Sequence, residues 1–156
     1  MAAINDDVRV GRWLGGVITR DQTRARMAAW VDHWQEHGFG PWAVDEKATG
    51  QMIGRVGLMH HDDWTASTHD AEIGWALAPE VWNRGYATEA ALAVLEWARG
   101  RAGLRTIVSI TRPDNVRSRR VMDKLGLAYV EQTTWRGFEQ VWYVIDLVGQ
   151  PDRLPT

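Results

Sequence analysis

The chain of 156 residues contains no cysteine. Disulfide bonds, thiolate metal sites and a cysteine nucleophile are therefore excluded. Long apolar runs are also missing, because even the stretch at residues 90–95 is far shorter than a bilayer span. The first ten residues, MAAINDDVRV, carry acids and lack the apolar core of a secretory signal. We therefore expect a cytoplasmic protein with no membrane partner.

The chain also lacks a strong excess of charge, with a formal net charge of −2. The charges are unevenly placed. Residues 84–124 hold nine Lys or Arg and four Asp or Glu, and the remaining residues hold nine and sixteen. The basic segment suits an anionic ligand and the acidic remainder suits a cationic one, although solvated helix faces are a simpler explanation. No basic stripe alternates with aromatic residues, so nucleic acid is not an expected partner.

What the chain does contain is typical of one globular domain. With 45% hydrophobic residues, we expect a single domain over residues 1–156, with frayed ends at residues 1–4 and 149–156. Ten tryptophans are unusual for this length and predict core or cleft walls, since each ring buries a large area. Four of them are candidates for an aromatic acceptor cleft, although core packing explains them equally: Trp30, Trp34, Trp42 and Trp135.

Local patterns predict alternating helices and strands. The sequence TRDQ at residues 19–22 is a capping box that opens a helix ending near Gly38. The apolar stripe expected for this helix recurs every three or four residues: Met27, Trp30, Val31 and Trp34. Further helices follow turns at residues 84–88 and 112–115, and residues 60–69 form a polar loop. Strands are expected at residues 42–45, 52–59, 71–77, 104–111, 127–133 and 138–148.

The most informative local feature is the turn at residues 84–88, between a strand and a helix. Gly85 and Ala87 are small enough for backbone N–H groups to approach a ligand. The helix start adds unpaired donors and the positive end of the dipole, Arg84 adds a fork of donors, and Thr88 can cap or reach an anion. This pattern predicts a phosphate-binding turn, and a plain tight connection is the alternative. It matches neither a Walker motif nor a dinucleotide fingerprint.

Two segments carry a family resemblance. The stretch WNRGYATEA at residues 82–90, preceded by AEIGW at residues 71–75, resembles the acetyl-CoA signature of the GNAT family of N-acetyltransferases. The stretch NVRSRRVMDKLGL at residues 115–127 is similar to the branch that contains ribosomal-protein alanine N-acetyltransferases. The resemblance covers about residues 5–148. It implies an α/β (α+β) fold with a mixed, largely antiparallel central sheet and helices on both faces, lacking the usual first strand.

The resemblance also implies acetyl-CoA as co-substrate and assigns its site. The turn at residues 84–88 holds the pyrophosphate, a splayed strand ending near Leu77 pairs with pantetheine, and Asn115 and Ser118 line the thioester end. The complete set of cofactor-binding residues that we expect is Leu77, Trp82, Asn83, Arg84, Gly85, Tyr86, Ala87, Thr88, Asn115 and Ser118.

Amine acylation needs a neutral amine, a polarised carbonyl and a proton for the leaving thiolate. We expect Glu72 to act as general base, through water, or only to position a cationic amine; a plain surface carboxylate is the third possibility. Many family members carry a tyrosine seven residues after the asparagine, where this chain has Met122. The resemblance leaves the Ser118 hydroxyl, or a water that it holds, as proton donor. A backbone N–H near residues 75–77 would face the carbonyl oxygen.

Histidine-rich segments raise the question of a metal. His33 and His37 are four residues apart, and residues 60–63 read HHDD, followed by His69. A metal site needs three or four ligands that converge, and these lie on separate elements. We expect no metal, and a solvated helix face and loop instead.

The resulting hypothesis is an N-acetyltransferase that moves an acetyl group to a primary amine of a peptide or small molecule. Its rival is an acyl-CoA-binding sensor with weak or no catalysis, which Met122 and the short N-terminal segment favour and which Glu72 and Ser118 oppose. The acceptor is open among peptide N-termini, polyamines, aminoglycosides and small amino compounds. An uncovered sheet edge near the N-terminus, with an apolar C-terminal hairpin near it, predicts a homodimer.

Overall fold

The structure is a computed structural model that describes residues 1–101 and 103–148. The expected fraying at residues 149–156 lies outside the described residues. We expected residues 1–4 to fray, but residues 2–4 belong to the short helix α1. The helices are α1 Ala2–Asn5, α2 Val8–Gly11, α3 Arg20–His37, the 3₁₀ turn η1 Pro79–Val81, α4 Tyr86–Arg99 and α5 Val116–Lys124.

Six strands form one sheet in the order β1-β2-β3-β4-β6-β5. The strands are β1 Pro41–Glu46, β2 Gln51–Met59, β3 Ala71–Leu77, β4 Thr106–Thr111, β5 Ala128–Trp135 and β6 Phe138–Asp146. Every neighbouring pair is antiparallel except β3 and β4. The predicted fold class is therefore confirmed. Within the described part of the chain, the segments before β1 are helical, as expected for a sheet without the usual first strand.

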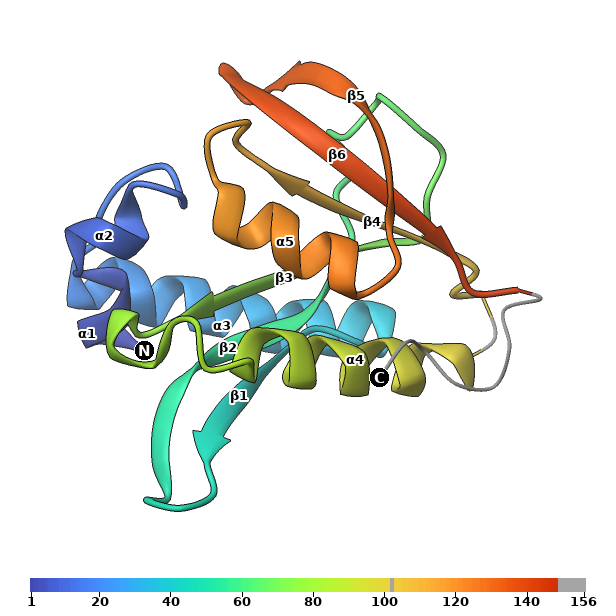
Figure 1. The fold of residues 1–156 in the computed structure, drawn as a ribbon. Coiled ribbons are helices and arrows are strands. Elements are labelled where there is room, and N and C mark those ends of the chain that lie inside the picture. Colours follow the sequence, from blue (N-terminus) through green and yellow to red (C-terminus); the bar gives the residue numbers. More distant parts are fainter. Residues whose placement is uncertain (102, 149–156) are drawn as a thin grey trace.

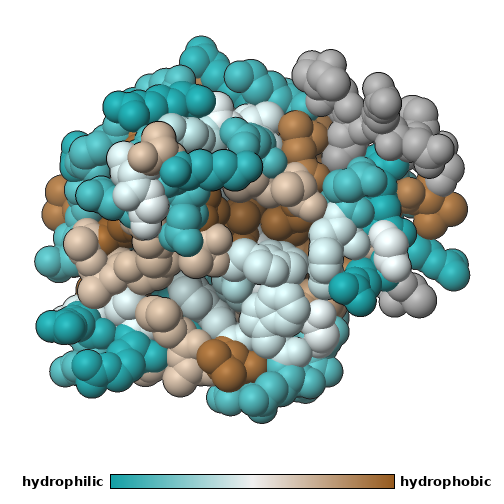
Figure 2. All heavy atoms as spheres, turned by 90° about the horizontal axis from the view of Figure 1, so that it is seen from below, coloured by the Kyte–Doolittle hydropathy of each residue, from teal (hydrophilic) through white to brown (hydrophobic). Residues whose placement is uncertain are grey.

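Helices cover both faces of the sheet, with α4 and α5 in front and α3 behind (Figure 1). Between the sheet and α4 and α5 lies the main core, which includes Leu58, Ile73, Leu95, Ile107 and Leu125. From below, apolar residues gather in a recessed central region and hydrophilic residues dominate the periphery (Figure 2). Ala91, Val94, Leu95 and Ala98 form a buried apolar stripe on α4, which fixes the helix that begins at the candidate phosphate-binding turn.

Helix α3 starts as predicted but turns a different face to the sheet. Thr19 and Gln22 form the capping box through reciprocal side-chain hydrogen bonds. The predicted apolar stripe is right for Trp30 and Trp34, which are half-buried, and wrong for Met27 and Val31, which are 45% and 55% exposed. The other buried or half-buried residues of this helix are Thr23, Arg26, His33 and His37. Helix α3 lines a cavity with Arg26, Ala29, Trp30 and His33, so its inward face carries charged and ring-nitrogen groups beside apolar ones.

The C-terminal hairpin is not near the N-terminal sheet edge, which corrects our expectation. Strands β5 and β6 lie at the opposite end of the sheet from β1. The apolar residues Val141, Tyr143 and Ile145 of this hairpin are buried in the main core. The sheet therefore has two separate edges, β1 and β5, rather than one shared apolar region.

The segment between β2 and β3 is packed, rather than looped out as predicted. Trp64 is buried and clusters with Val108 and Trp142 on the sheet face opposite the main core. Its ring meets the Trp135 and Trp142 rings edge to face, with centroids 5.4 and 5.8 Å apart. The packing of Trp64 therefore holds this segment against the sheet, and it also holds the histidines and acids at residues 60–63.

Strands β3 and β4 diverge after a short contact. Their parallel pairing consists of Ala71 with Ile107 and Glu72 with Val108. At the fork, Ser109 Oγ donates a hydrogen bond to the Ile73 carbonyl at 2.8 Å. Strand β3 stays paired with β2 as far as Leu77, so one of its sides is left without a strand partner. The splay that the resemblance implied is present. It separates β3 from β4 beyond Glu72.

Candidate active site

A cavity of about 820 Å³ occupies the opening between β3 and β4 and continues toward α3. This volume is within the range of small-molecule sites. Glu72 lines it, and so do all of the predicted cofactor-binding residues except Arg84. The structure therefore brings together residues from β3, the turn before α4, and α5.

The turn before α4 keeps its backbone donors free. Gly85 is the N-cap residue, with φ 86°, and no side chain caps the helix. Asn83 is also left-handed, with φ 63°. A Cβ atom built on Gly85 would meet no atom within 4 Å. The first N–H groups of α4 thus point to open space at the positive end of the helix dipole, which is a site for an anion.

Side chains of this turn attach it to the rest of the fold. Tyr86 Oη donates to Glu46 Oε1 at 2.7 Å, and Arg84 Nη1 lies 3.8 Å from the same oxygen. The Tyr86 hydrogen bond is the main cause that lowers the pKa of Glu46. Trp82 Nε1 donates to the Leu77 carbonyl at 2.8 Å, so that carbonyl is partly used within the chain. Tyr86 and Trp82 therefore hold the turn in place and leave its backbone to face the cavity.

Asn115 and Ser118 form a local pair at the start of α5. Asn115 Nδ2 donates to Thr111 Oγ1 at 2.9 Å and to Ser118 Oγ at 3.0 Å, and its Oδ1 accepts from Ser118 N at 3.4 Å. Because Ser118 Oγ accepts the Asn115 bond, its own proton is available for another acceptor. Met122 is buried, with 1% exposure, and offers no proton there.

Glu72 is paired with a residue that the sequence did not single out. Its Oε2 lies 2.6 Å from His61 Nε2, and the two side chains are 16% and 14% exposed. Its Oε1 has no hydrogen-bond partner among the described residues and lies 3.9 Å from the position that a Cβ of Gly74 would take. One carboxylate oxygen is thus held by the imidazole, and the other borders open space in the cavity.

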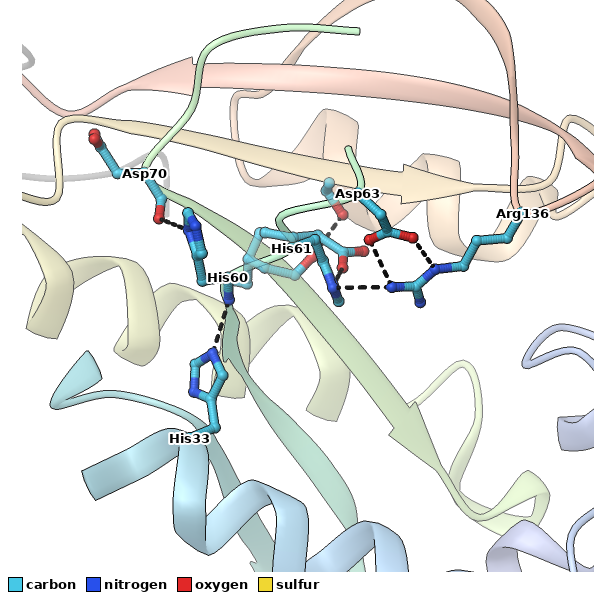
Figure 3. A network of polar contacts seen from close by, with 9 residues as sticks. His33, His60, His61, Asp63, Asp70 and Arg136 are labelled. Atoms are coloured by element: carbon cyan, nitrogen blue, oxygen red, sulfur yellow. Dashed lines mark hydrogen bonds and ion pairs between the residues drawn. The ribbon is translucent and has the colours of Figure 1, made fainter. Parts of the chain in front are cut away.

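His61 is in turn connected to the β5–β6 turn. Arg136 Nη2 lies 3.5 Å from His61 Nδ1, and Asp63 accepts two hydrogen bonds from Arg136 at 2.7 and 2.8 Å (Figure 3). The Arg136 hydrogen bond is the first cause that lowers the pKa of Asp63. Our sequence analysis named His61 and Asp63 only as part of a histidine-rich segment, did not connect them with Glu72, and gave Arg136 no role. The pairing of Met59 with Glu72 places the residues after β2 beside Glu72, and this register is visible only in the folded sheet.

The remaining histidines have structural partners. His33, expected on a solvated face, is buried; its Nδ1 lies 2.8 Å from the Phe39 carbonyl and its Nε2 accepts from His60 N at 2.9 Å (Figure 3). Burial lowers the pKa of His33. Among residues 1–101 and 103–148, no group of three or more His, Asp or Glu residues is arranged to hold a metal ion. No described helix combines the length and the apolar character that crossing a bilayer requires.

Comparisons with known proteins identify similar chains. The family model described as "Acetyltransferase (GNAT) domain" matches residues 1–128. The uncharacterized protein YkkB of Bacillus subtilis is 30% identical over 128 residues, which cover 80% of this chain and 71% of YkkB. The crystal structure of an acetyltransferase from Agrobacterium tumefaciens is 27% identical, has a TM-score of 0.78, and matches over 92% of this chain and 81% of its own.

A third similarity concerns a structure with a bound cofactor. The putative acetyltransferase YncA from Salmonella typhimurium, solved with acetyl-CoA, has a TM-score of 0.65 and 18% identity. The match covers 81% of this chain and 75% of YncA. At this identity, the likeness concerns the fold alone.

Proposed function

Because this chain belongs to the GNAT acetyltransferase family, we propose that it transfers the acetyl group of acetyl-CoA to a primary amine of a small molecule or peptide by direct attack. The observation that carries the proposal is one cavity, lined by the α4 turn, the free side of β3, Glu72 and Ser118. The similar fold of YncA, solved with acetyl-CoA, supports the choice of donor.

On the donor side, the backbone N–H groups of the α4 turn would bind the pyrophosphate. Gly85 faces open space there. The side of β3 released by the fork would pair with pantetheine and place the thioester beside the start of α5. Arg117 lies over the Trp82 ring at 4.9 Å and, with Arg120 and Lys124, adds positive charge to this part of the cavity wall.

On the acceptor side, the amine nitrogen attacks the thioester carbonyl, so that a C–N bond forms as the C–S bond breaks. The amine gives up one proton to Glu72, directly or through a water. The departing CoA thiolate takes one proton from the Ser118 hydroxyl, which solvent restores. His61 holds Glu72 Oε2, so Oε1 is the oxygen that faces the acceptor. Each group lines the same cavity, as the reaction requires.

The rival function is an acyl-CoA-binding sensor, which the buried Met122 favours because it replaces a proton donor. A thiol-release assay with acetyl-CoA and a panel of amines separates the two functions. The proposed enzyme releases CoA thiol only when a suitable amine is present. Binding of acetyl-CoA without release for any amine would support the sensor instead.

Gly74→Val should block the acceptor without disturbing the donor. A Cβ at position 74 points into the space beside Glu72 Oε1, and valine is well suited to a strand. We expect a loss of roughly tenfold or more in kcat/KM for the amine, since the added methyl groups occupy its place. Steady-state kinetics with calorimetry of CoA binding checks this, and Gln132→Val is the control, since Gln132 is exposed on β5 and does not line the cavity. Unchanged kinetics would show that the amine does not lie over Gly74.

We also propose a homodimer. Strand edges at β1 and β5 lack a partner strand among the described residues, and Tyr129 and Phe138 are exposed beside the β5 edge. Light scattering at tens of micromolar should give about twice the 17.7 kDa chain mass. A mass of one chain would contradict the dimer.

A further inference from the structure

The acceptor side of the cavity contains two guanidinium groups that have no carboxylate partner. Arg55 comes from β2 and Arg26 from α3, and both line the cavity. Neither forms an ion pair with a described carboxylate, whereas Arg9, Arg12 and Arg136 each do.

Arg55 is held in a fixed position. Its guanidinium lies over the Trp30 ring, with 5.0 Å from Cζ to the ring centroid. Its Nε is closed off from solvent and has no hydrogen-bond partner among the described residues. Burial is the main cause that lowers the pKa of Arg55 to about 10, with Arg26 adding repulsion and Glu72 acting in the opposite direction. The group is still a cation at neutral pH, and a buried cation is costly unless an anion accompanies it.

Arg55 and Glu72 lie on the same face of the sheet. Across β2 and β3, Arg55 pairs with Ala76, Gly57 with Gly74, and Met59 with Glu72. Paired residues of antiparallel strands share a face, and four residues of strand span about 13 Å of backbone. Glu72 opposes the lowering of the Arg55 pKa, so the two charges are close enough to interact. Gly74, in the middle, leaves open space, so a bound molecule can reach from Glu72 toward Arg55.

We propose that the acceptor is an amine that also carries a carboxylate, which Arg55 and Arg26 bind while the amine lies at Glu72. This inference rests on the proposed function, because it names the class of acceptor for the same cavity. A planar guanidinium fork matches a carboxylate, and the second guanidinium completes the neutralisation of Arg55. The cavity holds the Glu72 carboxylate on β3 and the guanidinium groups of Arg55 and Arg26 on β2 and α3, so a molecule with one amine and one carboxylate has a partner for each charge.

Matched acceptors test the proposal on the wild-type protein. A series of ω-amino carboxylates of increasing chain length is compared with the corresponding ω-amino amides, by kcat/KM for thiol release. We expect the best carboxylate to exceed its amide by roughly ten- to a hundred-fold, the usual worth of a hydrogen-bonded charge. Peptides with Asp or Asn as second residue show whether the carboxylate comes from a peptide instead. Equal rates within every pair would overturn the proposal.

Two variants and a control assign the effect to these arginines. Arg55→Gln should remove most of the preference for the carboxylate over its amide. Arg26→Gln, on an accessible helix, should reduce the preference and serves if Arg55→Gln does not fold. Arg24→Gln, on the same helix with a side chain 75% exposed, should change nothing. Full preference in both cavity variants would overturn the proposal.

The outcomes separate the two levels of inference. CoA affinity by calorimetry confirms that each variant is folded and binds the donor. Acetyl transfer to amines without any carboxylate preference overturns only this inference. If the wild-type protein acetylates no amine, the proposed function fails, and this inference fails with it.

Discussion

Replacing Glu72 by glutamine is expected to reduce acetyl transfer by roughly 10²–10⁴-fold, the range for loss of a general base, with CoA affinity unchanged. The amide has nearly the same shape and can still accept the His61 hydrogen bond that now holds Oε2 at 2.6 Å. It cannot take a proton from the amine. The loss should therefore appear in kcat and kcat/KM for the amine, measured by thiol release.

The kinetic pattern of Glu72→Gln also distinguishes the two roles that we considered for this carboxylate. A general base gives a reduced kcat and a changed pH–rate profile. A group that only positions a cationic amine gives a raised KM with kcat preserved. Glu36→Gln, on α3 with a side chain 75% exposed, is the control and should match wild type. Wild-type kinetics in Glu72→Gln would remove this residue from the mechanism.

Gly85→Val is expected to weaken CoA binding by roughly ten- to a hundred-fold or more, since at least one charge-assisted backbone hydrogen bond is lost. Gly85 has φ 86°, a conformation that a β-branched residue does not adopt without strain. The added side chain would also occupy the open space in front of the α4 N–H groups. Isothermal calorimetry with CoA measures the effect.

A matched glycine separates this local effect from general destabilisation. Gly38 also has a left-handed backbone, with φ 72°, and open surroundings, but it ends α3 and does not line the cavity. Gly38→Val should lower stability and leave CoA affinity unchanged. Wild-type affinity in a folded Gly85→Val protein would show that the pyrophosphate does not lie on this turn.

Local signals predicted the start of α3 and the turn before α4. The capping box at Thr19 and the small residue at position 85 depend on neighbours within a few residues, whereas the splay near Leu77 was implied by the family resemblance. Such features are written in short stretches of sequence. The family resemblance pointed to the same turn at residues 84–88. All of the cofactor-binding residues that it named line the cavity, apart from Arg84.

The acceptor side was not predictable in the same way. Apolar spacing predicted that Met27 and Val31 face the sheet. In the structure both are exposed, and Arg26 and His33 are half-buried and buried. Hydrophobic periodicity assumes that a helix packs on an apolar core, and one side of α3 lines a cavity instead. His61 meets Glu72 only because Met59 pairs with Glu72, and Arg136 reaches His61 across 75 positions of sequence. Register and long-range contacts of this kind are set by the assembled sheet.

The central claim is that this cavity joins acetyl-CoA to an amine, and product stoichiometry tests it most directly. Wild-type protein is incubated with acetyl-CoA and an amine from the panel, and mass spectrometry quantifies acetylated amine while a thiol reagent quantifies free CoA. We expect equal amounts of the two products, formed together, and neither above background with Glu72→Gln. Free CoA without acetylated amine, or neither product with any amine, would contradict acetyl transfer.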